Sequence, residues 1–181
     1  MDKINLNVIR ETFGKVVYTH KTQEKAADTC ISKSKWIRRI NVFLLALTSG
    51  SALGSIIEGH AFLISTSILS TISLFFVVYQ LNFNFEEEGQ RHKITAKKLW
   101  LIRERYQNLI ADVMNEKYST NEITEKRDSL LLELDEILEN APPTDDKAYS
   151  KARKALRVHG EMTFNNKEID SFLPEELRID S

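Results

Sequence analysis

The chain has 181 residues, and its Lys and Arg residues (25) nearly balance its Asp and Glu residues (26). A formal net charge of −1 gives no support to a nucleic-acid partner, because domains that bind nucleic acid directly concentrate positive charge. The mean hydropathy of −0.31 describes no part of the chain well, because Glu58 is the only formal charge between Arg39 and Glu86. An apolar middle is therefore flanked by two densely charged regions.

The cysteine content bears on the compartment and on metal binding. Cys30 is the only cysteine, so no intramolecular disulfide can form, and a cysteine-based zinc site is excluded on this count. A reducing, cytoplasm-facing environment fits this composition. The apolar region begins at Ile40, behind a long polar segment, whereas a secretory signal has its apolar stretch near the N-terminus. We therefore expect this region to remain in the membrane.

Residues 1–39 are predicted to form a cytoplasmic helix with one mostly apolar side. Alternating spacings of four and three residues are typical of a helix that packs on a neighbour. The residues that follow this spacing are Ile9, Phe13, Val16, His20, Gln23, Ala27 and Cys30. His20 and Gln23 interrupt the apolar pattern, and they are either polar groups satisfied inside a core, which we favour, or contacts for a partner.

Two apolar stretches follow, at residues 40–57 and 62–79, and each is long enough to cross a bilayer. Each would span about 27 Å as a helix, close to the thickness of the hydrocarbon core. The alternative is a buried helical hairpin of a soluble protein, but soluble helices carry a charged face and neither stretch has one. The sequence thus predicts an all-α fold with a two-helix transmembrane hairpin over residues 40–81.

The distribution of basic residues predicts the orientation of this hairpin. The connection at residues 58–61 carries no Lys or Arg, whereas basic residues are frequent on both flanks. Those before the first stretch include Lys33, Lys35, Arg38 and Arg39, and those after the second include Arg91, Lys93, Lys97 and Lys98. The positive-inside rule then places both termini in the cytoplasm and the connection on the other side of the membrane.

Small and polar residues recur at helical spacing within the two stretches. Ala46, Gly50 and Gly54 share one side of the first, where small residues let another helix approach closely. The candidates to face a pore, once subunits assemble, are Asn41, Thr48, Ser51, Ser55, Thr66, Ser70 and Ser73. Ser and Thr also hydrogen-bond within their own helix or to a neighbour, so packing is the alternative role. A pore requires an oligomer, because two helices cannot enclose a channel.

Residues 82–160 are predicted to form a second cytoplasmic helical region. Its first helix repeats spacings of three and four, and we expect the resulting apolar seam to mediate oligomerisation. The residues assigned to this assembly seam are Phe13, Leu99, Ile102, Tyr106 and Leu109.

Local signals then divide the rest of the chain. Ser119 and Glu122 have the spacing of a capping box, and the pair Pro142 and Pro143 stops the helix that it starts. A shorter, basic helix is expected to begin near Asp145 and to end near Gly160. The tail, residues 161–181, mixes large apolar residues with charges and is expected to form a packed terminal arm.

Motifs of known enzymes are not present in the sequence. It has no phosphate-binding glycine loop, no His, Cys or carboxylate spacing typical of a metal site, and no nucleophile elbow. We therefore expect a protein that is not an enzyme and that needs no cofactor or metal.

The order of these parts resembles the SLATT family, the bacterial two-transmembrane effector domains associated with nucleotide-signalling antiviral systems. The residues that carry the resemblance are Tyr18-Thr19-His20-Lys21-Thr22 and Ala26-Ala27 before the membrane, and His92, Ala96, Leu99-Trp100 and Arg103 after it. It covers residues 5–140 and extends toward the whole chain.

The resemblance implies an effector of the bacterial inner membrane that oligomerises into a pore, depolarises the membrane and arrests or kills the cell. Its partners would be the lipid bilayer, further copies of itself, and a separately encoded sensor or nucleotide-messenger synthase. The alternative is an anchor or scaffold that does not conduct and holds a cytoplasmic sensor at the membrane.

Overall fold

The computed structural model describes residues 2–58 and 60–178, apart from the side chains of residues 55, 57, 58, 60, 61 and 176. Its regular elements are all helical, which confirms the predicted all-α class. In chain order they are α1 (Lys3–Glu58), α2 (His60–Asn82), α3 (Phe85–Met114), α4 (Thr120–Glu139), α5 (Asp146–Arg157), α6 (Asn166–Phe172) and the 3₁₀ turn η1 (Glu175–Leu177).

The structure has one helix, α1, where the sequence predicted a cytoplasmic helix followed by a separate apolar stretch. It has 56 residues and is therefore about 84 Å long. Residues 3–58 include no proline, and their glycines stand singly, so nothing in the sequence ends the helix. The change in composition near residue 39 is a change of environment along one continuous rod.

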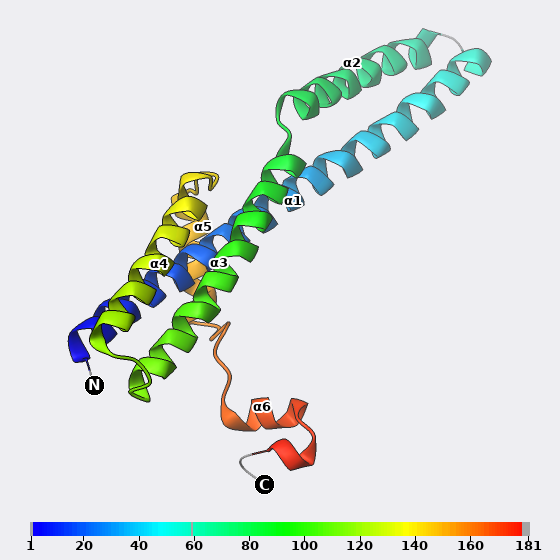
Figure 1. Ribbon diagram of the computed structural model, residues 1–181. Coiled ribbons are helices and arrows are strands. Elements are labelled where there is room, and N and C mark those ends of the chain that lie inside the picture. The colour runs from blue at the N-terminus through cyan, green and yellow to red at the C-terminus, as the bar shows by residue number, and fades with distance from the viewer. Residues whose placement is uncertain (1, 59, 179–181) are drawn as a thin grey trace.

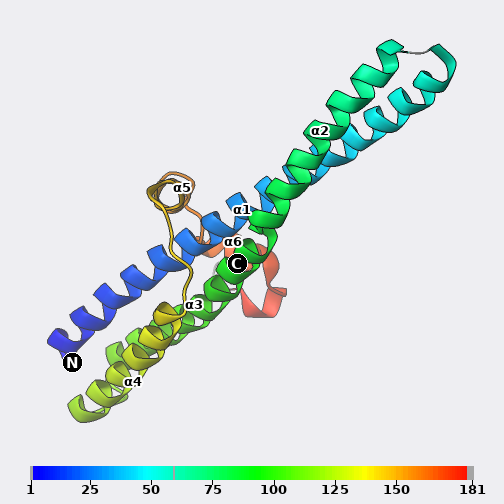
Figure 2. The same ribbon diagram turned by 90° about the horizontal axis from the view of Figure 1, so that it is seen from above.

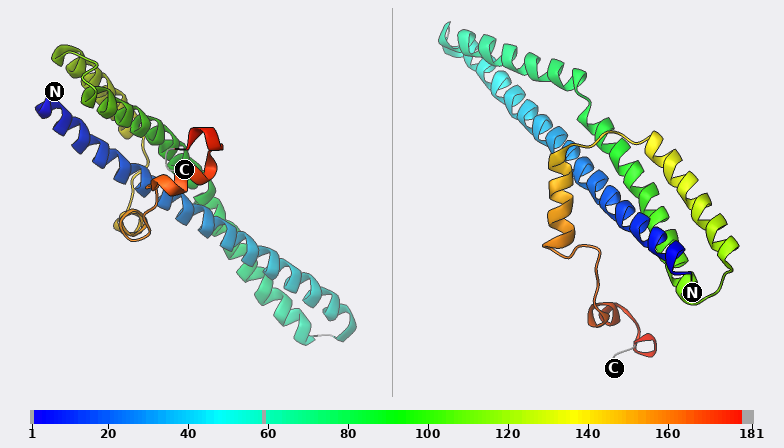
Figure 3. Two further views of the ribbon diagram at one scale, coloured as in Figure 1. Left: turned by 90° about the horizontal axis from the view of Figure 1, so that it is seen from below. Right: turned by 90° about the vertical axis from the view of Figure 1, so that its left-hand side faces the viewer.

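The C-terminal part of α1 and the whole of α2 form an apolar arm, residues 40–82. Figures 1 and 3 show the two helices side by side and projecting away from the rest of the molecule. Large apolar side chains cover its surface, and Phe43 and Phe75 are 64% and 65% exposed. Among the described residues, one helical segment, Phe62–Met114, includes an 18-residue window apolar enough to cross a membrane, with a mean hydropathy of 2.0 and only 6% of it buried.

The other helices form a bundle around the N-terminal part of α1. Helix α3 packs along α1, α4 packs on α3, and α5 crosses α1 (Figure 2). The core joins buried residues of α1, α3 and α4, which are Leu6, Ile9, Val16, Leu99, Ile102, Tyr106, Leu109, Val113, Ile123, Leu130 and Leu134. The apolar spacing in the sequence thus marks the side of each helix that faces this core.

The helix ends follow the local signals in the sequence. Ser119 and Glu122 make the predicted capping box, and α4 ends at Glu139, before the two prolines. The side chain of Asp145 caps α5 by accepting a hydrogen bond from the backbone of Ala148. Arg157 then fixes the end of α5 to α1, because its Nε donates to the hydroxyl of Tyr18 at 2.7 Å.

The expectation of a packed terminal arm is wrong. Helix α6 has only seven residues, and Figure 3 shows it standing away from the bundle. Phe164, Phe172 and Leu177 are exposed, Phe172 to 76%. A helix this short has no room for an apolar side wide enough to pack on the bundle, so these residues remain at the surface.

Gly89 sets the distance between α1 and α3 where the bundle meets the arm. A Cβ atom at Gly89 would lie 2.8 Å from Cγ1 of Ile31, closer than Cβ atoms approach other groups, and 3.3 Å from Cβ of Cys30, which is a tight contact. The absence of a side chain at this position therefore lets the two helices touch. By contrast, a Cβ atom at Gly14 would meet nothing within 4 Å.

We predict that Gly89→Ala and Gly14→Ala change stability in opposite directions. The new methyl at residue 89 forces α1 and α3 apart and costs about 1–2 kcal/mol after the gain in helix propensity. At residue 14 only that gain remains, about 0.5–1 kcal/mol. Thermal unfolding of the purified chain in detergent, followed by circular dichroism, should show a lower midpoint for the first variant and a higher one for the second. Equal midpoints would contradict the close contact.

Candidate functional site

Hydroxyl groups form a polar seam between α1 and α2 inside the apolar arm. The Oγ atoms of Ser51 and Ser65 lie 2.7 Å apart, and Thr66 Oγ1 donates to Ser51 Oγ at 2.8 Å. Ser51 Oγ also lies 3.1 Å from the carbonyl oxygen of Phe62. These groups satisfy one another within an apolar surface, where a polar group without a partner is costly.

A second polar contact lies at the opposite end of the seam, near the bundle. Asn41 Nδ2 donates to Gln80 Oε1 at 3.1 Å. Two buried oxygen atoms of the arm, Asn41 Oδ1 and Ser73 Oγ, have no hydrogen-bond partner among the described residues. The seam therefore has unused hydrogen-bonding capacity.

Thr48 and Ser70, two further pore-facing candidates, take no part in these contacts. Thr48 is half-buried, and its Oγ1 donates within its own helix to the carbonyl of Leu44 at 2.8 Å. Ser70 is exposed. The side chain of Ser55 lies outside the described residues.

The small residues proposed for helix packing differ in their surroundings. Ala46 and Gly50 are exposed, and a Cβ atom at Gly50 would meet nothing within 4 Å. Gly54 faces α2, because a Cβ atom there would lie 2.8 Å from the ring of Phe62. Within one chain only Gly54 is at a close helix contact, and Ala46 and Gly50 offer a flat surface to the outside.

The residues of the assembly seam are occupied within the protomer. Leu99, Ile102, Tyr106 and Leu109 are buried between α1, α3 and α4, and Phe13 packs against them. In this arrangement they hold the bundle together, and only Phe13 of the five is partly exposed.

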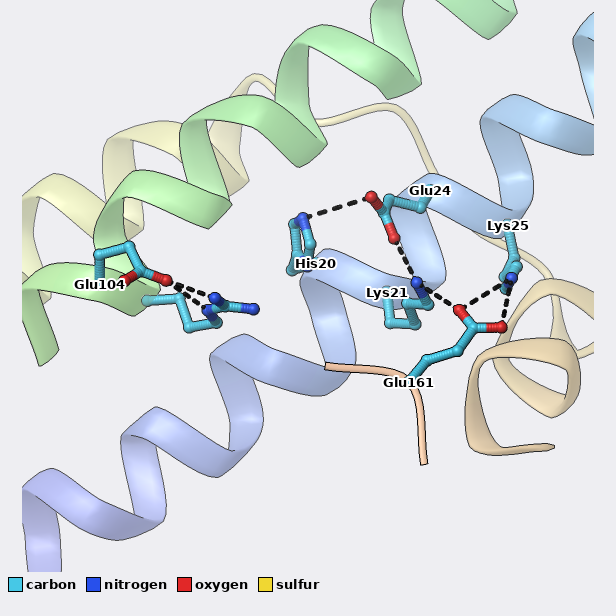
Figure 4. A network of polar contacts seen from close by, with 7 residues as sticks. His20, Lys21, Glu24, Lys25, Glu104 and Glu161 are labelled. Carbon is cyan, nitrogen blue, oxygen red and sulfur yellow. Dashed lines mark hydrogen bonds and ion pairs between the residues drawn. The ribbon is translucent and has the colours of Figure 1, made fainter. Parts of the chain in front are cut away.

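A cluster of charged side chains joins the C-terminal segment, residues 158–178, to the middle of α1 (Figure 4). Lys21 Nζ lies 2.6 Å from Glu161 and 2.7 Å from Glu24, and Lys25 Nζ lies 3.3 Å from Glu161. Glu161 follows α5, so its carboxylate bridges two lysines that are far from it in the sequence. Figure 4 shows His20 on the same stretch of α1, with its ring toward Glu24.

The pKa values of this cluster follow from its contacts. Hydrogen bonding to Lys21, with the nearby charge of Lys25, lowers the pKa of Glu161. Burial alone would lower the pKa of Lys21, but its hydrogen bonds to Glu161 and Glu24 outweigh burial and raise it. Burial lowers the pKa of His20, which favours the neutral ring. The cluster at neutral pH is thus two ion-paired lysines beside an uncharged histidine.

A cavity of about 670 Å³ opens beside this cluster, between α1 and α3. Four lysines line it, together with Glu24, Asp28 and the half-exposed indole of Trp100. The lysines are Lys21, Lys25, Lys93 and Lys97. Such a lining suits a partner or ligand that carries negative charge.

The structure also brings together three side chains that the sequence pattern did not associate. Cys30, Glu88 and His92 have their ligand-type atoms within 4.8 Å of one another. Glu88 and His92 are four residues apart on α3, a spacing that places both on one face, and this was the only signal available in the sequence. The approach of Cys30 depends on the packing of α1 against α3.

Comparison with known families settles the class of the chain. Residues 6–168 match the family described as SMODS and SLOG-associating 2TM effector domain family 4. The chain belongs to this SLATT family. Comparisons with curated proteins and with solved structures found no match.

The family description is consistent with the all-α fold and its apolar arm. A SLATT domain is an effector with two transmembrane segments that associates with SMODS and SLOG proteins, and such domains are generally membrane effectors rather than enzymes. In this SLATT chain the match includes the bundle, the apolar arm and Glu161, and it ends within α6. The polar seam of the arm and the charged cluster around Glu161 are thus both parts of the family's domain.

We predict that Glu161→Gln releases the C-terminal segment of this SLATT chain from α1. The neutral amide cannot pair with Lys21 and Lys25, so trypsin at neutral pH should cut after Lys167 several-fold faster than in the unmodified chain. Cleavage is read by mass spectrometry, and Glu175→Gln, further along the same segment, is the matched control. Equal cleavage rates in all three chains would mean that Glu161 does not hold the segment.

Acidification should have the same effect on the unmodified chain. The pKa of Glu161 is lower in the folded protein than the ordinary value of 4.5. The contact therefore stabilises the segment above that value, and the stabilisation is lost as the pH falls through the lowered pKa. Hydrogen exchange of α6, corrected for the intrinsic rate, should increase at acid pH in the unmodified chain and already be fast at neutral pH in Glu161→Gln.

Proposed function

We propose that this chain is the membrane effector of a bacterial antiviral system of the nucleotide-signalling type. It lies in the inner membrane with both termini in the cytoplasm, and the arm crosses the bilayer as a two-helix hairpin. On activation, copies of the chain assemble into a pore that depolarises the membrane and arrests growth or kills the cell. The family assignment and the apolar surface of the arm support this proposal.

The observation that carries the proposal is the continuity of α1 from the bundle to the tip of the arm. A helix resists bending, because each backbone hydrogen bond closes one turn on the next. A change in how α3 or α5 packs on the first half of α1 therefore rotates or tilts the second half. No separate structural element is then needed to transmit a movement from the cytoplasmic bundle to the arm.

The polar seam supplies the groups that such a movement would expose. In one chain Ser65 and Thr66 each bond to Ser51, and interhelical hydrogen bonds in membranes average only about 0.6 kcal/mol each. Partners from a second copy can replace them at small cost. Asn41, Ser73 and Ser70 then face a shared axis with Ser51 and Thr66, and Ala46 and Gly50 provide the flat surface on which neighbouring copies pack.

The trigger acts on the cytoplasmic bundle in this proposal. A separately encoded sensor or a nucleotide messenger with negative charge would enter the cavity lined by Lys21, Lys25, Lys93 and Lys97. Two of these lysines hold Glu161, so occupation of the cavity and release of the C-terminal segment are coupled. The buried core of α1, α3 and α4 keeps the bundle intact while α1 changes its orientation.

The second candidate function is an anchor that holds a sensor at the membrane without conducting. It is favoured by the hydrogen bonds of Ser51 to Ser65 and Thr66, because these hydroxyl groups already have partners within one chain and need none from a second copy. The two functions differ in what they require of the polar side chains.

We predict that Ser51→Leu and Ser70→Leu each abolish depolarisation and growth arrest in a bacterial host in which the partner genes are active. Leucine favours insertion, so an anchor tolerates both changes, whereas a pore loses its polar lining. Ser49→Leu is the matched control, since Ser49 is exposed and donates only within its own helix, to Leu45. Membrane potential is followed with a voltage-sensitive dye, and the amount of each variant in the membrane fraction is measured in parallel.

Unchanged depolarisation in both variants would remove Ser51 and Ser70 from the conduction path. An unchanged membrane potential with the unmodified chain, under conditions where the partner system is active, would leave the anchor as the function.

A further inference from the structure

Cys30, Glu88 and His92 form a cluster at the junction between the bundle and the arm. Sγ of Cys30, a carboxylate oxygen of Glu88 and a ring nitrogen of His92 all lie within 4.8 Å of one another. His92 is 2% exposed, Cys30 is half-buried and Glu88 is exposed, so the cluster runs from the core to the surface. One residue comes from α1 and two come from α3.

Hydrogen bonds outside the cluster decide which nitrogen of His92 is free. Gln23 Nε2 lies 3.1 Å from the carbonyl oxygen of Pro142, and a carbonyl can only accept, so the amide nitrogen of Gln23 must point there. Gln23 Oε1 then faces Nδ1 of His92 at 2.5 Å and accepts its hydrogen. In the neutral ring the lone pair is consequently on Nε2. An imidazole oriented in this way by an outer acceptor is the usual arrangement of a metal-binding histidine.

The backbone is also adapted to bring the three groups together. Gly89 lies next to Glu88, and its missing side chain allows Cys30 to approach, since a Cβ atom there would be 3.3 Å from Cβ of Cys30. Glycine, which has no side chain, thus lies between Glu88 and His92 on α3, at the point where Cys30 approaches from α1.

A cavity of about 290 Å³ connects these side chains to the surface, and its lining includes charges of both signs. Three lysines line it, but Lys33 lies over the ring of Phe85 at 5.3 Å and Lys151 donates to Thr29 Oγ1 at 2.9 Å. Two of the positive charges are thus held by other groups. Asp145 adds a second carboxylate to the same lining.

We propose that Cys30, Glu88 and His92 bind a divalent transition-metal ion of the zinc type. A thiolate and an imidazole favour zinc over magnesium or calcium, and one sulfur, one nitrogen and one oxygen ligand leave a fourth position for water. Tetrahedral bonds of ordinary length place such ligand atoms about 3.3–3.8 Å apart, so the cluster closes by about 1 Å on binding. Glu88 is exposed and free to make that movement. The thiol of Cys30 releases its proton to solvent as the bond from sulfur to metal forms.

The ion would join α1 to α3 at the base of the arm. This inference does not depend on pore formation, because the site is complete within one chain. A bound metal fixes the contact at Gly89 and so holds α1 in one orientation relative to the bundle.

The test uses the full chain, purified in detergent through a tag without histidines and freed of metal with a chelator. Cobalt(II) is the probe, because a cobalt–thiolate bond gives a charge-transfer absorption band and zinc displaces it. We expect one equivalent of cobalt to produce the band, zinc to abolish it, and zinc to raise the thermal midpoint. Cys30→Ser should lose the band entirely, and Glu88→Gln should weaken zinc binding by tenfold or more.

Glu139→Gln, an exposed carboxylate at the end of α4, is the control and should bind like the unmodified chain. Glu88 is exposed, so its substitution tests the site without disturbing the fold, and circular dichroism confirms that each variant is folded. The proposal is overturned if the folded chain gives no thiolate band, or if Glu88→Gln and Glu139→Gln bind zinc with the same affinity as the unmodified protein.

Discussion

The fold depends on one helix that must satisfy two environments. The first half of α1 buries Ile9, Val16 and Ala27 against other helices, while the second half exposes Val42, Phe43 and Leu53. A helix satisfies its own backbone in either environment, so α1 passes from one to the other without a turn. Because the same rod forms part of the core and half of the arm, the orientation of the arm is fixed by packing at the opposite end of the molecule.

Polar groups are concentrated where they can control this packing. In the arm, the serine and threonine hydroxyls meet between α1 and α2, and the outer surface is left to apolar side chains. In the bundle, Gln23 bridges His92 and Pro142, and Lys21 bridges Glu24 and Glu161. Apart from the pair Lys21 and Glu24, which lies within α1, each of these contacts joins α1 to another part of the chain. A ligand or partner that replaces one of them acts directly on α1.

Much of this arrangement can be predicted from sequence, because it depends on local signals. The spacing of apolar residues identified the core side of α1 and α3, and the capping box and the two prolines located the ends of α4. His20 and Gln23 were both expected to be satisfied core polar groups. The bonds of Gln23 to His92 and Pro142 confirm this for Gln23. It is wrong for His20, whose buried Nδ1 has no hydrogen-bond partner among the described residues. The length of α1 was not predicted, because the change from basic to apolar residues near Arg39 was taken as the boundary between two segments, and such a change does not end a helix.

The contacts between distant residues could not be predicted. Glu161 reaches Lys21 only because α5 crosses α1, and Cys30 reaches His92 only because Gly89 lets two helices touch. A single cysteine excludes the common zinc sites built on several thiolates, yet it does not exclude a mixed set of ligands that packing assembles. The apolar residues of the tail were expected to pack because of their number, but α6 is too short to bury them.

The most direct test of the coupling through α1 is the membrane potential of cells that express Trp36→Pro while the partner system is active. Trp36 lies on α1 between the bundle and the arm and is 61% exposed, so its loss removes little packing. Proline there removes a backbone hydrogen bond and kinks the helix, whereas Trp36→Ala keeps the helix intact and serves as the control. If α1 transmits the signal, Trp36→Ala depolarises the membrane like the unmodified chain, and Trp36→Pro, inserted in equal amount, does not. Equal depolarisation by the two variants would contradict the account.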